Sequence, residues 1–414
     1  MKTVIMAGGK GTRISSIDNT VPKPMLVICG KPILEWQILN LKKCGLIDIL
    51  IVVGHLGDVI KDYFGDGSKF GVSIEYFIED KPLGTAGALF KLNMEEDFLL
   101  MCGDLIIDVD FNRFIEFHKS NNALATLLTH PNDHPYDSSI IVTENNHHRV
   151  IKWLNKEDER LYYKNRVNSG IEIISPLLLK QVNIKTDKID LDREVLKPNI
   201  SSGKIYSYDT SEYIKDIGTP QRFTEVENDI KNGIVCSRNL KNKQKAIFLD
   251  RDGTINKYVG FLNKVEQLEL IEGVSEAIKH INKSGYLAIV ITNQPVIARG
   301  ECSWEELNEI HNKLETELGR DGAFIDGIYI CPHHPDRGFD GERIEYKIKC
   351  DCRKPKCGLL LQAASDFNID LSQSIMIGDT ESDIKCGESA NCKKNILLER
   401  NKNNSLLEII RNII

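Results

Sequence analysis

The chain has 414 residues, of which 41% are hydrophobic and 27% charged, and its formal net charge is −7 at pH 7. This length predicts two domains, and the composition is typical of an ordinary globular protein in water. The negative charge argues against a nucleic-acid partner, although local basic pockets for phosphate stay open. No stretch approaches the ~18 to 20 apolar residues of a membrane helix, so we expect no membrane partner.

The first residues, MKTVIMAGG, read as a short β-strand that runs into a glycine loop, which is too brief for a signal peptide. The eleven cysteines do not form a secreted disulfide pattern, because three of them fall with a histidine into a metal-like cluster and the rest are scattered along the chain. We therefore expect a cytoplasmic enzyme.

From residue 1 to about 230, short apolar runs alternate with amphipathic helical stretches, which predicts an α/β sheet. The apolar runs include Ile49–Val53, Phe98–Cys102 and Ala123–Leu128, and the helical stretches lie near Pro32–Cys44 and Phe111–Ser120.

A glycine loop follows the first predicted strand, Thr3–Met6, and offers backbone N–H groups to phosphates. It is not a Walker A loop, since Gly11 and not Ser or Thr follows Lys10, and it lacks the third glycine of a dinucleotide fingerprint. By itself the loop could be a plain tight turn. The motifs that follow it in order are Pro22-Lys23-Pro24-Met25, Pro82-Leu83-Gly84-Thr85-Ala86-Gly87, Cys102-Gly103-Asp104, Val167-Asn168-Ser169-Gly170 and Tyr213–Pro220.

This ordered set resembles the sugar-1-phosphate nucleotidyltransferases over nearly all of residues 1–230. The resemblance implies a Rossmann-like, GT-A-like mixed sheet in which a sugar phosphate attacks the α-phosphorus of a nucleoside triphosphate. It implies phosphate neutralisation by Arg13 and Lys23, and Mg²⁺ binding by Asp104 and Asp216. The implied nucleotide and sugar contacts are Gly8, Gly9, Gly11, Thr12, Gly84, Thr85, Asn168, Gly170 and Lys156. Where the family usually shows Glu-Lys, this chain has Asn155-Lys156.

A polar, Lys/Asn-rich stretch between Lys231 and Lys245 predicts a linker at 233–244, between a domain at 1–232 and a domain at 245–414. Beyond it the alternation restarts. The predicted strands are Ala246–Leu249, Leu287–Thr292, Gly327–Cys331 and Ile375–Ile377, and the predicted helices are Ser303–Leu318, with a capping box from Ser303 to Glu306, and Leu359–Phe367.

Two carboxylates, Asp250 and Asp252, follow the strand Ala246–Leu249 at the edge where open α/β sheets place their ligands. Phosphate-ester hydrolysis through a covalent intermediate needs a carboxylate nucleophile and an acid/base, and Asp250 and Asp252 fit these roles. Two further strand ends contribute Thr292-Asn293-Gln294, whose hydroxyl and amides can hold phosphoryl oxygens, and Asp379, which can complete a Mg²⁺ site with Asp250.

A second cluster of possible metal ligands comprises Cys331, His333, Cys350 and Cys352. Three thiolates and one imidazole form a closed tetrahedral set that is typical of structural Zn²⁺. His334 points to the opposite side of an extended chain from His333, and we leave it and Cys357 out of the set. Free buried cysteines are the alternative.

The motifs DRDGTIN, TNQPVIARG and CDCRKPK, over essentially all of residues 245–400, resemble the haloacid-dehalogenase superfamily, and within it the heptose-bisphosphate and histidinol-phosphate phosphatases. The resemblance implies a second Rossmann-like domain with a zinc loop, in which Asp250 is the nucleophile and Asp252 the acid/base. It implies Mg²⁺ on Asp250, Asp379 and the carbonyl of Asp252, with phosphate contacts from Thr292, Arg353 and Lys354. The zinc loop would position Arg353 and Lys354. Thr380 departs from the family, which often has Lys there.

The two halves together favour a bifunctional enzyme. Its second domain would remove the 7-phosphate of D-glycero-D-manno-heptose 1,7-bisphosphate, and its first domain would transfer a nucleotide to the 1-phosphate. Resemblance to heptose-1-phosphate guanylyltransferases favours GTP. Mannose 1-phosphate, histidinol phosphate, and one half acting as a binding module are the alternatives. The sequence leaves the nucleotide, the anomer, channelling and a homo-oligomer open.

Overall fold

The computed structural model describes residues 1–9, 21–144 and 147–414. These residues form two compact units. The first comprises Met1–His130, Ile141–Trp153 and Asn168–Asn239, and the second comprises Pro131–Ile140, Leu154–Val167 and Leu240–Ile414. The last change of unit lies between Asn239 and Leu240, within the stretch that the sequence suggested as a linker. This stretch also contains a short helix, α6 (Ile234–Ser237), whose Val235 is buried.

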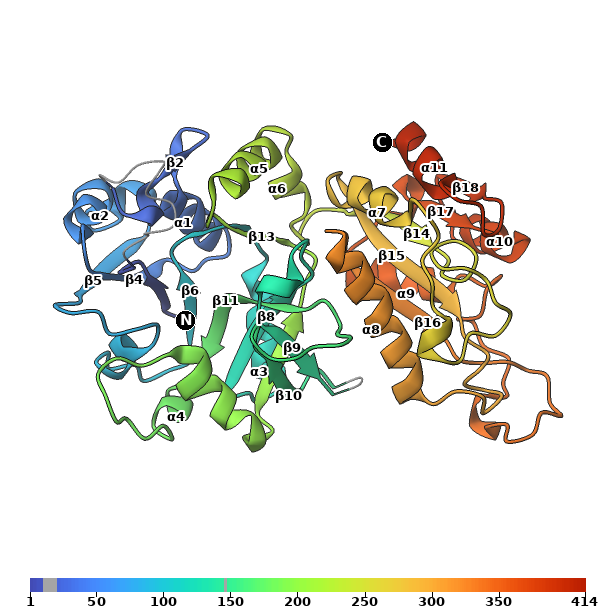
Figure 1. Cartoon of the computed structure of the whole chain (residues 1–414). Coiled ribbons are helices and arrows are strands. Elements are labelled where there is room, and N and C mark those ends of the chain that lie inside the picture. Colours follow the sequence, from blue (N-terminus) through green and yellow to red (C-terminus); the bar gives the residue numbers. More distant parts are fainter. Residues whose placement is uncertain (10–20, 145–146) are drawn as a thin grey trace. The chain divides into compact units, whose positions relative to one another are not determined.

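The first unit is built on a mixed sheet (Figure 1) with the strand order β10-β9-β11-β6-β1-β4-β5, and β8 joins β11 to β12. The central strands β6, β1, β4 and β5 are parallel, and β11 runs antiparallel to β6. The bounds are β1 Thr3–Met6, β4 Asp48–Val53, β5 Ser73–Ile78, β6 Phe98–Cys102, β8 Ala125–His130, β9 Ile140–Thr143, β10 Val150–Leu154, β11 Val167–Ile174 and β12 Ile205–Asp209.

Alternate residues of the central strands face opposite sides of this sheet, as the pleat requires. Ile5 packs into the core formed with α1 (Ile33–Lys43), α2 (Gly57–Phe64) and α3 (Phe111–Ser120). Its neighbour Val4 packs into a second core that includes residues of α4 (Pro176–Leu179). Smaller elements complete the unit: β2 (Val27–Ile28) with β3 (Lys31–Pro32), β7 (Leu105–Asp108) with β13 (Tyr213–Asp216), and α5 (Pro220–Lys231).

The second unit is built on a parallel sheet with the order β16-β15-β14-β17-β18. The bounds are β14 Lys245–Leu249, β15 Tyr286–Asn293, β16 Gly327–Cys331, β17 Ile375–Gly378 and β18 Lys394–Leu397. Because all five strands run the same way, their carboxyl ends lie at one edge, where α/β sheets bind ligands.

Helices cover both faces of this second sheet, which makes a three-layer unit. Ile247 and Leu249 pack with α7 (Val274–Asn282), α8 (Trp304–Arg320) and α11 (Ser405–Ile413), whereas Phe248 packs with α9 (Gly358–Asp366) and α10 (Glu381–Ser389). Burial on both faces explains why the strands read as continuous apolar runs.

The elements expected from the sequence are confirmed with small changes at their ends. Thr3–Met6, Phe98–Cys102, Phe111–Ser120 and Gly327–Cys331 have the expected bounds, and the run expected at Ala123–Leu128 forms Ala125–His130. The capping box is also present, since Ser303 accepts from the backbone of Glu306, which reaches back to the backbone of Ser303. No helix among the described residues is long and apolar enough to cross a membrane.

Candidate active sites

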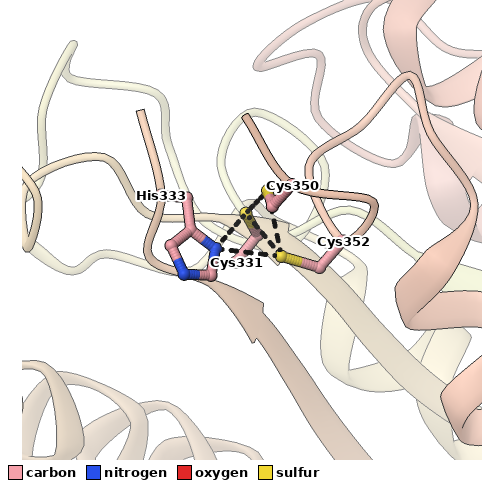
Figure 2. A group of neighbouring side chains, drawn as sticks. All are labelled: Cys331, His333, Cys350 and Cys352. Atoms are coloured by element: carbon pink, nitrogen blue, oxygen red, sulfur yellow. Dashed lines mark hydrogen bonds between the residues drawn. The ribbon is translucent and has the colours of Figure 1, made fainter. Parts of the chain in front are cut away.

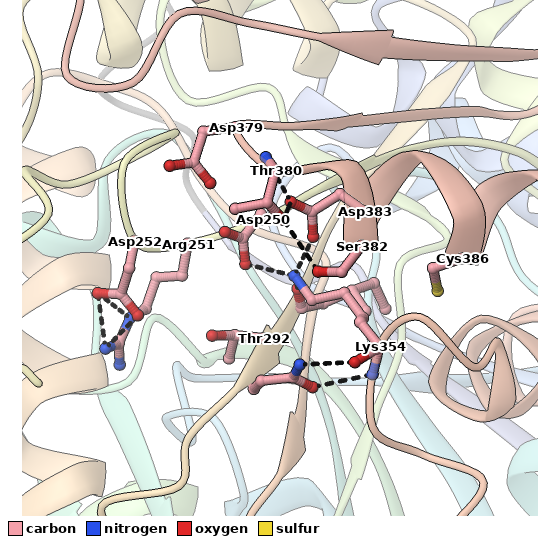
Figure 3. A network of polar contacts seen from close by, with 12 residues as sticks. Asp250, Arg251, Asp252, Thr292, Lys354, Asp379, Thr380, Ser382, Asp383 and Cys386 are labelled. Atoms are coloured by element: carbon pink, nitrogen blue, oxygen red, sulfur yellow. Dashed lines mark hydrogen bonds and ion pairs between the residues drawn. The ribbon is translucent and has the colours of Figure 1, made fainter. Parts of the chain in front are cut away.

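Three carboxylates converge at the carboxyl ends of β14 and β17 (Figure 3). Asp250 follows β14, whereas Asp379 and Asp383 follow β17, and one oxygen of each lies within 4.8 Å of the others. Gly253 permits this approach, because a Cβ at its φ of +88° would lie 2.3 Å from Asp379 Oδ2. Hard carboxylate oxygens are the ligands that Mg²⁺ prefers, so this donor set fits that ion.

Lys354 supplies a cation to this cluster from the loop that precedes α9. Its Nζ lies 2.5 Å from Asp250 Oδ1 and 2.6 Å from Asp383 Oδ1, and it donates to the carbonyl oxygen of Ile291 at 2.9 Å. Burial would lower the pKa of Lys354, but the two carboxylates raise it, so the ammonium stays charged. Burial raises the pKa of Asp250 to about 7, against the opposing effect of Lys354. The site therefore places a desolvated carboxylate beside a fixed cation.

The side chain of Asp252 turns toward Arg251 and away from this cluster (Figure 3). Arg251 Nη2 donates to Asp252 Oδ1 at 2.9 Å and to Oδ2 at 2.8 Å, and Asn256 and Gln294 add one donor each. Burial would raise the pKa of Asp252, but Arg251 and the two amides hold it below its ordinary value. The carboxylate is thus ionised and oriented by three neighbours.

The Thr292-Asn293-Gln294 segment at the end of β15 is used largely to fix its surroundings. Gln294 Nε2 donates to Asp252 Oδ2 and to Thr292 Oγ1, each at 2.8 Å. Asn293 exchanges two hydrogen bonds with the backbone of Lys354, at 3.1 and 3.2 Å. The structure therefore assigns Asn293 and Gln294 contacts that hold Lys354 and Asp252.

The four aspartates, Asn293, Gln294 and Lys354 line a cavity of about 250 Å³. Arg353 and Arg400 add positive charge to its wall, and Tyr258 and Phe261 add aromatic surface. Arg400 forms an ion pair with Asp379 and lies over the ring of Tyr258 at 4.3 Å. Thr380, where the sequence departs from the resembling family, caps α10 by bonding Asp383. The cavity thus combines carboxylates that can hold a metal ion with cations that can contact a phosphate group.

The expected zinc ligands lie together (Figure 2). Cys352 Sγ is 3.1 Å from Cys331 Sγ, 3.2 Å from Cys350 Sγ and 3.2 Å from His333 Nδ1. A tetrahedral zinc with Zn–S bonds of about 2.3 Å needs sulfur atoms about 3.8 Å apart, so the cluster is already close to that geometry. The S₃N donor set fits Zn²⁺. His334 and Cys357 lie outside the set.

In the first unit, the predicted metal ligands Asp104 and Asp216 lie at the ends of neighbouring segments. β13 pairs with β7 so that Asp216 faces Leu105, and Ile217 donates to the carbonyl oxygen of Asp104 at 3.2 Å. Lys23 Nζ lies 2.5 Å from Asp104 Oδ2, and Arg222 Nη1 lies 2.8 Å from Asp216 Oδ1. Two carboxylates with cations beside them are suited to phosphate and metal chemistry.

The residues predicted to contact the nucleotide and the sugar lie in several different segments. Gly84 has φ +82° and lies against Ile189, and Thr85 Oγ1 accepts from Leu191 N at 2.7 Å. Asn168 and Gly170 lie in β11, with Gly170 beside Cys102. Gly8 and Gly9 follow β1, while Gly11, Thr12 and Arg13 lie outside the described residues. Lys156 is exposed and belongs to Leu154–Val167 of the second unit.

Three acidic residues at these sites were not predicted from the sequence. Asp383 joins the carboxylate cluster of Asp250 and Asp379, and the GDTESD run in which it lies could have indicated this. Glu172 is buried in β11, where burial and then Asp192 raise its pKa to about 8, and a glutamate inside an apolar strand was the signal. Glu79 follows β5, and its Oε2 would lie 2.4 Å from a Cβ on Gly8.

Comparisons with known proteins match the N-terminal and C-terminal parts of the chain to different families. The family model described as nucleotidyl transferase matches residues 2–233, and one described as HAD-hydrolase-like matches residues 351–406. The D-glycero-beta-D-manno-heptose-1,7-bisphosphate 7-phosphatase of Haemophilus influenzae is 42% identical over 158 residues, which cover 38% of this chain and 83% of that protein. The corresponding Haemophilus ducreyi protein is 42% identical over 160 residues, covering 38% and 85%.

Solved structures also resemble part of the chain. A Bacillus anthracis protein described as a glucose-1-phosphate thymidylyltransferase, in complex with a sucrose, matches with a TM-score of 0.50 and 23% identity, over 55% of this chain and 96% of that one. At this identity the likeness shows the fold alone.

Fold and sites together define an α/β enzyme with two activities, nucleotidyl transfer in the N-terminal half and phosphate-ester hydrolysis in the C-terminal half. The chain belongs to the nucleotidyl transferase family and, through residues after the first domain, to the family of the heptose-bisphosphate phosphatases.

Proposed function

We propose that the C-terminal site removes the 7-phosphate from D-glycero-D-manno-heptose 1,7-bisphosphate, and that the N-terminal site transfers GMP from GTP to the resulting heptose 1-phosphate. The observation that carries the proposal is the buried group of Asp250, Lys354, Asp379 and Asp383 in a chain whose relatives act on that bisphosphate. The product of one reaction is the substrate class of the other.

In the proposed hydrolysis, Asp250 attacks the phosphorus of the 7-phosphate. The substrate would enter as its phosphate monoanion, whose proton passes to the Asp252 carboxylate. The ester P–O bond breaks, an Asp250 O–P bond forms, and Asp252 gives that proton to the departing sugar oxygen. Water then attacks the phosphoaspartate, Asp252 takes a proton from that water, and inorganic phosphate leaves. Lys354, Arg353 and the Thr292 hydroxyl would hold the phosphoryl oxygens, which is the largest contribution expected in such a site.

We propose Mg²⁺ as the cofactor of this site, held by the carboxylates of Asp250, Asp379 and Asp383 and the carbonyl oxygen of Asp252. When bound, the ion would neutralise phosphoryl charge. The Cys331, His333, Cys350 and Cys352 set would hold a structural Zn²⁺ with no open position. Arg353 Nη1 donates to the carbonyl oxygen of His333 at 3.1 Å, which supports a role for the zinc loop in placing the cations.

In the proposed nucleotidyl transfer, an oxygen of the sugar 1-phosphate attacks the α-phosphorus of the triphosphate and pyrophosphate leaves. Lys23 and Arg13 would neutralise the phosphates, and Asp104 and Asp216 would hold the Mg²⁺. Gly8, Gly9, Gly84 and Thr85 would contact the nucleotide, and Asn168 and Gly170 the sugar.

Glu79 supports GTP as the nucleotide. It stands at the carboxyl end of β5 beside Gly8, and among the described residues its Oε1 has no hydrogen-bond partner. An ionised carboxylate only accepts hydrogen bonds, and guanine offers two adjacent donors, N1–H and the exocyclic N2–H₂. Adenine, cytosine and uracil do not offer this pair.

We place the enzyme in the cytoplasm, because sugar phosphates and nucleoside triphosphates are cytoplasmic metabolites and a reducing compartment keeps zinc-binding thiols available. The test is phosphate release from heptose 1,7-bisphosphate and from histidinol phosphate, followed by pyrophosphate release from the four common triphosphates with heptose 1-phosphate and mannose 1-phosphate. We expect the heptose substrates and GTP to be fastest. Faster turnover of histidinol phosphate would reject the proposed phosphatase substrate.

A further inference from the structure

Arg251 is a fully buried cation beneath the phosphatase site. It stands between the two aspartates that follow β14, and it is 0% exposed. A buried guanidinium is costly unless it is paired, and an apolar side chain of similar volume would usually stabilise a core as well or better. The contacts of Arg251 therefore indicate what it does there.

The guanidinium engages one carboxylate with most of its donors. Nε and Nη2 donate to Asp252 Oδ1 at 3.2 and 2.9 Å, and Nη2 donates to Oδ2 at 2.8 Å. Asn256 Nδ2 adds a donor to Oδ1 at 3.0 Å and Gln294 Nε2 one to Oδ2 at 2.8 Å. Among these neighbours only Arg251 supplies charge, so it contributes both orientation and charge balance.

The remaining side of the guanidinium is held by a helix. Arg251 Nη1 lies 3.0 Å from Nε2 of His311, a buried residue of α8. Burial, and then the charge of Arg251, lower the pKa of His311 to about 3. The ring is therefore neutral, and its Nε2 accepts because a guanidinium can only donate. His311 thus fixes the orientation of the Arg251 guanidinium through one hydrogen bond, and the neutral ring leaves the positive charge to be balanced by Asp252.

We propose that Arg251, held in place by His311, is a positioning residue that fixes the orientation of the Asp252 carboxylate in the cavity that Asp250 also lines. The inference rests on the proposed phosphatase function, in which Asp252 gives and then takes the proton. Loss of Arg251 would leave Asp252 free to turn and without charge compensation, and the proton-transfer steps would slow while substrate binding stayed nearly constant.

The test compares two leaving groups in four full-length variants, Arg251→Met, Arg251→Lys, His311→Phe and His311→Gln. The sugar alkoxide of heptose 1,7-bisphosphate needs a proton as it departs, whereas p-nitrophenolate does not. For Arg251→Met we expect kcat on the bisphosphate to fall by about 100-fold, in the range for losing general acid–base catalysis, with KM changed by less than about threefold. The burst of p-nitrophenolate from p-nitrophenyl phosphate should keep a nearly wild-type rate.

The matched variants sharpen this expectation. Arg251→Lys keeps the positive charge but loses the planar guanidinium that donates to both carboxylate oxygens. Its kcat on the bisphosphate should therefore lie between those of Arg251→Met and the wild type. His311→Gln keeps an acceptor and should stay near wild type, whereas His311→Phe should lose about tenfold. Nucleotidyl transfer by the same chain shows whether the first unit of each variant is folded. The melting temperature of the second unit shows whether that unit is folded.

Equal losses in kcat on the bisphosphate and in the p-nitrophenolate burst would overturn the inference, because they would indicate structural support alone. Wild-type kcat in Arg251→Met would overturn it as well. If Arg251→Met does not fold, the contrast between the His311 variants decides. A separate experiment tests the proposed phosphatase function itself: if the Asp250→Asn variant still releases phosphate, that function is rejected.

Discussion

Arg353 Nη1 donates to the carbonyl oxygen of His333 at 3.1 Å, so a cation of the phosphatase cavity is tied to a residue of the Cys/His cluster. The next residue, Lys354, is the one that reaches Asp250 and Asp383. A disturbance of the cluster should therefore spread directly to the charges around the phosphoryl group.

Loss of a proposed zinc ligand should impair the phosphatase and spare the transferase. We expect Cys352→Ser to lower phosphate release by at least about tenfold and to reduce the bound zinc from one ion per chain to none, because zinc-binding free energy is folding free energy in such loops. Zinc content by atomic absorption and both activities would be measured. Cys236→Ser, at an exposed cysteine outside the cluster, is the control. Equal phosphatase activity in both variants would contradict a positioning role for the loop.

An isosteric change tests the proposed role of Asp250 as the nucleophile. Asp250→Asn should lower phosphate release by about 1,000-fold or more, because an amide cannot form the covalent intermediate, while pyrophosphate release stays unchanged. Asp340→Asn, at an exposed carboxylate, should leave both activities at wild-type levels. Trapping of a labelled phosphoryl group in Asp340→Asn but not in Asp250→Asn would complete the assignment. Loss of both activities in Asp250→Asn would show that the two sites are not independent.

Glu79 should determine the choice of nucleotide. We expect Glu79→Gln to lower kcat/KM for GTP by about 10- to 100-fold, the range for one well-placed pair of hydrogen bonds to a base, with smaller effects on the other triphosphates. A triphosphate panel on both proteins measures this, and Glu95→Gln, at an exposed glutamate of the same unit, is the matched control. A uniform loss for all four triphosphates would show that Glu79 supports the loop rather than reading the base.

His311 should make the second unit less stable in acid. Its folded-state pKa of about 3 lies below the ordinary value of about 6.5, so the unfolded chain binds more protons between these values. The contribution is present above pH 6.5 and is lost as the pH falls. Between pH 7 and pH 5 the expected loss in the free energy of unfolding is roughly 2 kcal/mol.

The measurement is urea unfolding of the wild type and His311→Gln at both pH values. The difference between the two proteins cancels the titration of the groups that they share, and it should shrink by roughly 2 kcal/mol at pH 5. A difference that does not change with pH would show that His311 is protonated in the folded chain.

The sequence alone determined that the chain has two α/β halves, with nucleotidyl transfer in the first and phosphate-ester hydrolysis in the second. Apolar runs such as Gly327–Cys331 and Phe98–Cys102 became strands with the expected bounds, because burial on both faces leaves a continuous signal. The sequence also singled out Asp250, Lys354 and the Cys/His set as candidates, since each stands in a short motif behind a strand or in close pairs, and the structure brings the members of each group together.

Only the tertiary structure decided which side chains share a site and where each one points. Asp383 joins Asp250, and Gln294 turns to Asp252, through contacts between segments far apart in the chain. His311 gave no signal, because one histidine on a helix face has the same pattern whether it packs in a core or meets a buried cation. Its role depends on α8 lying against the end of β14, and periodicity along one element carries no information about its neighbour.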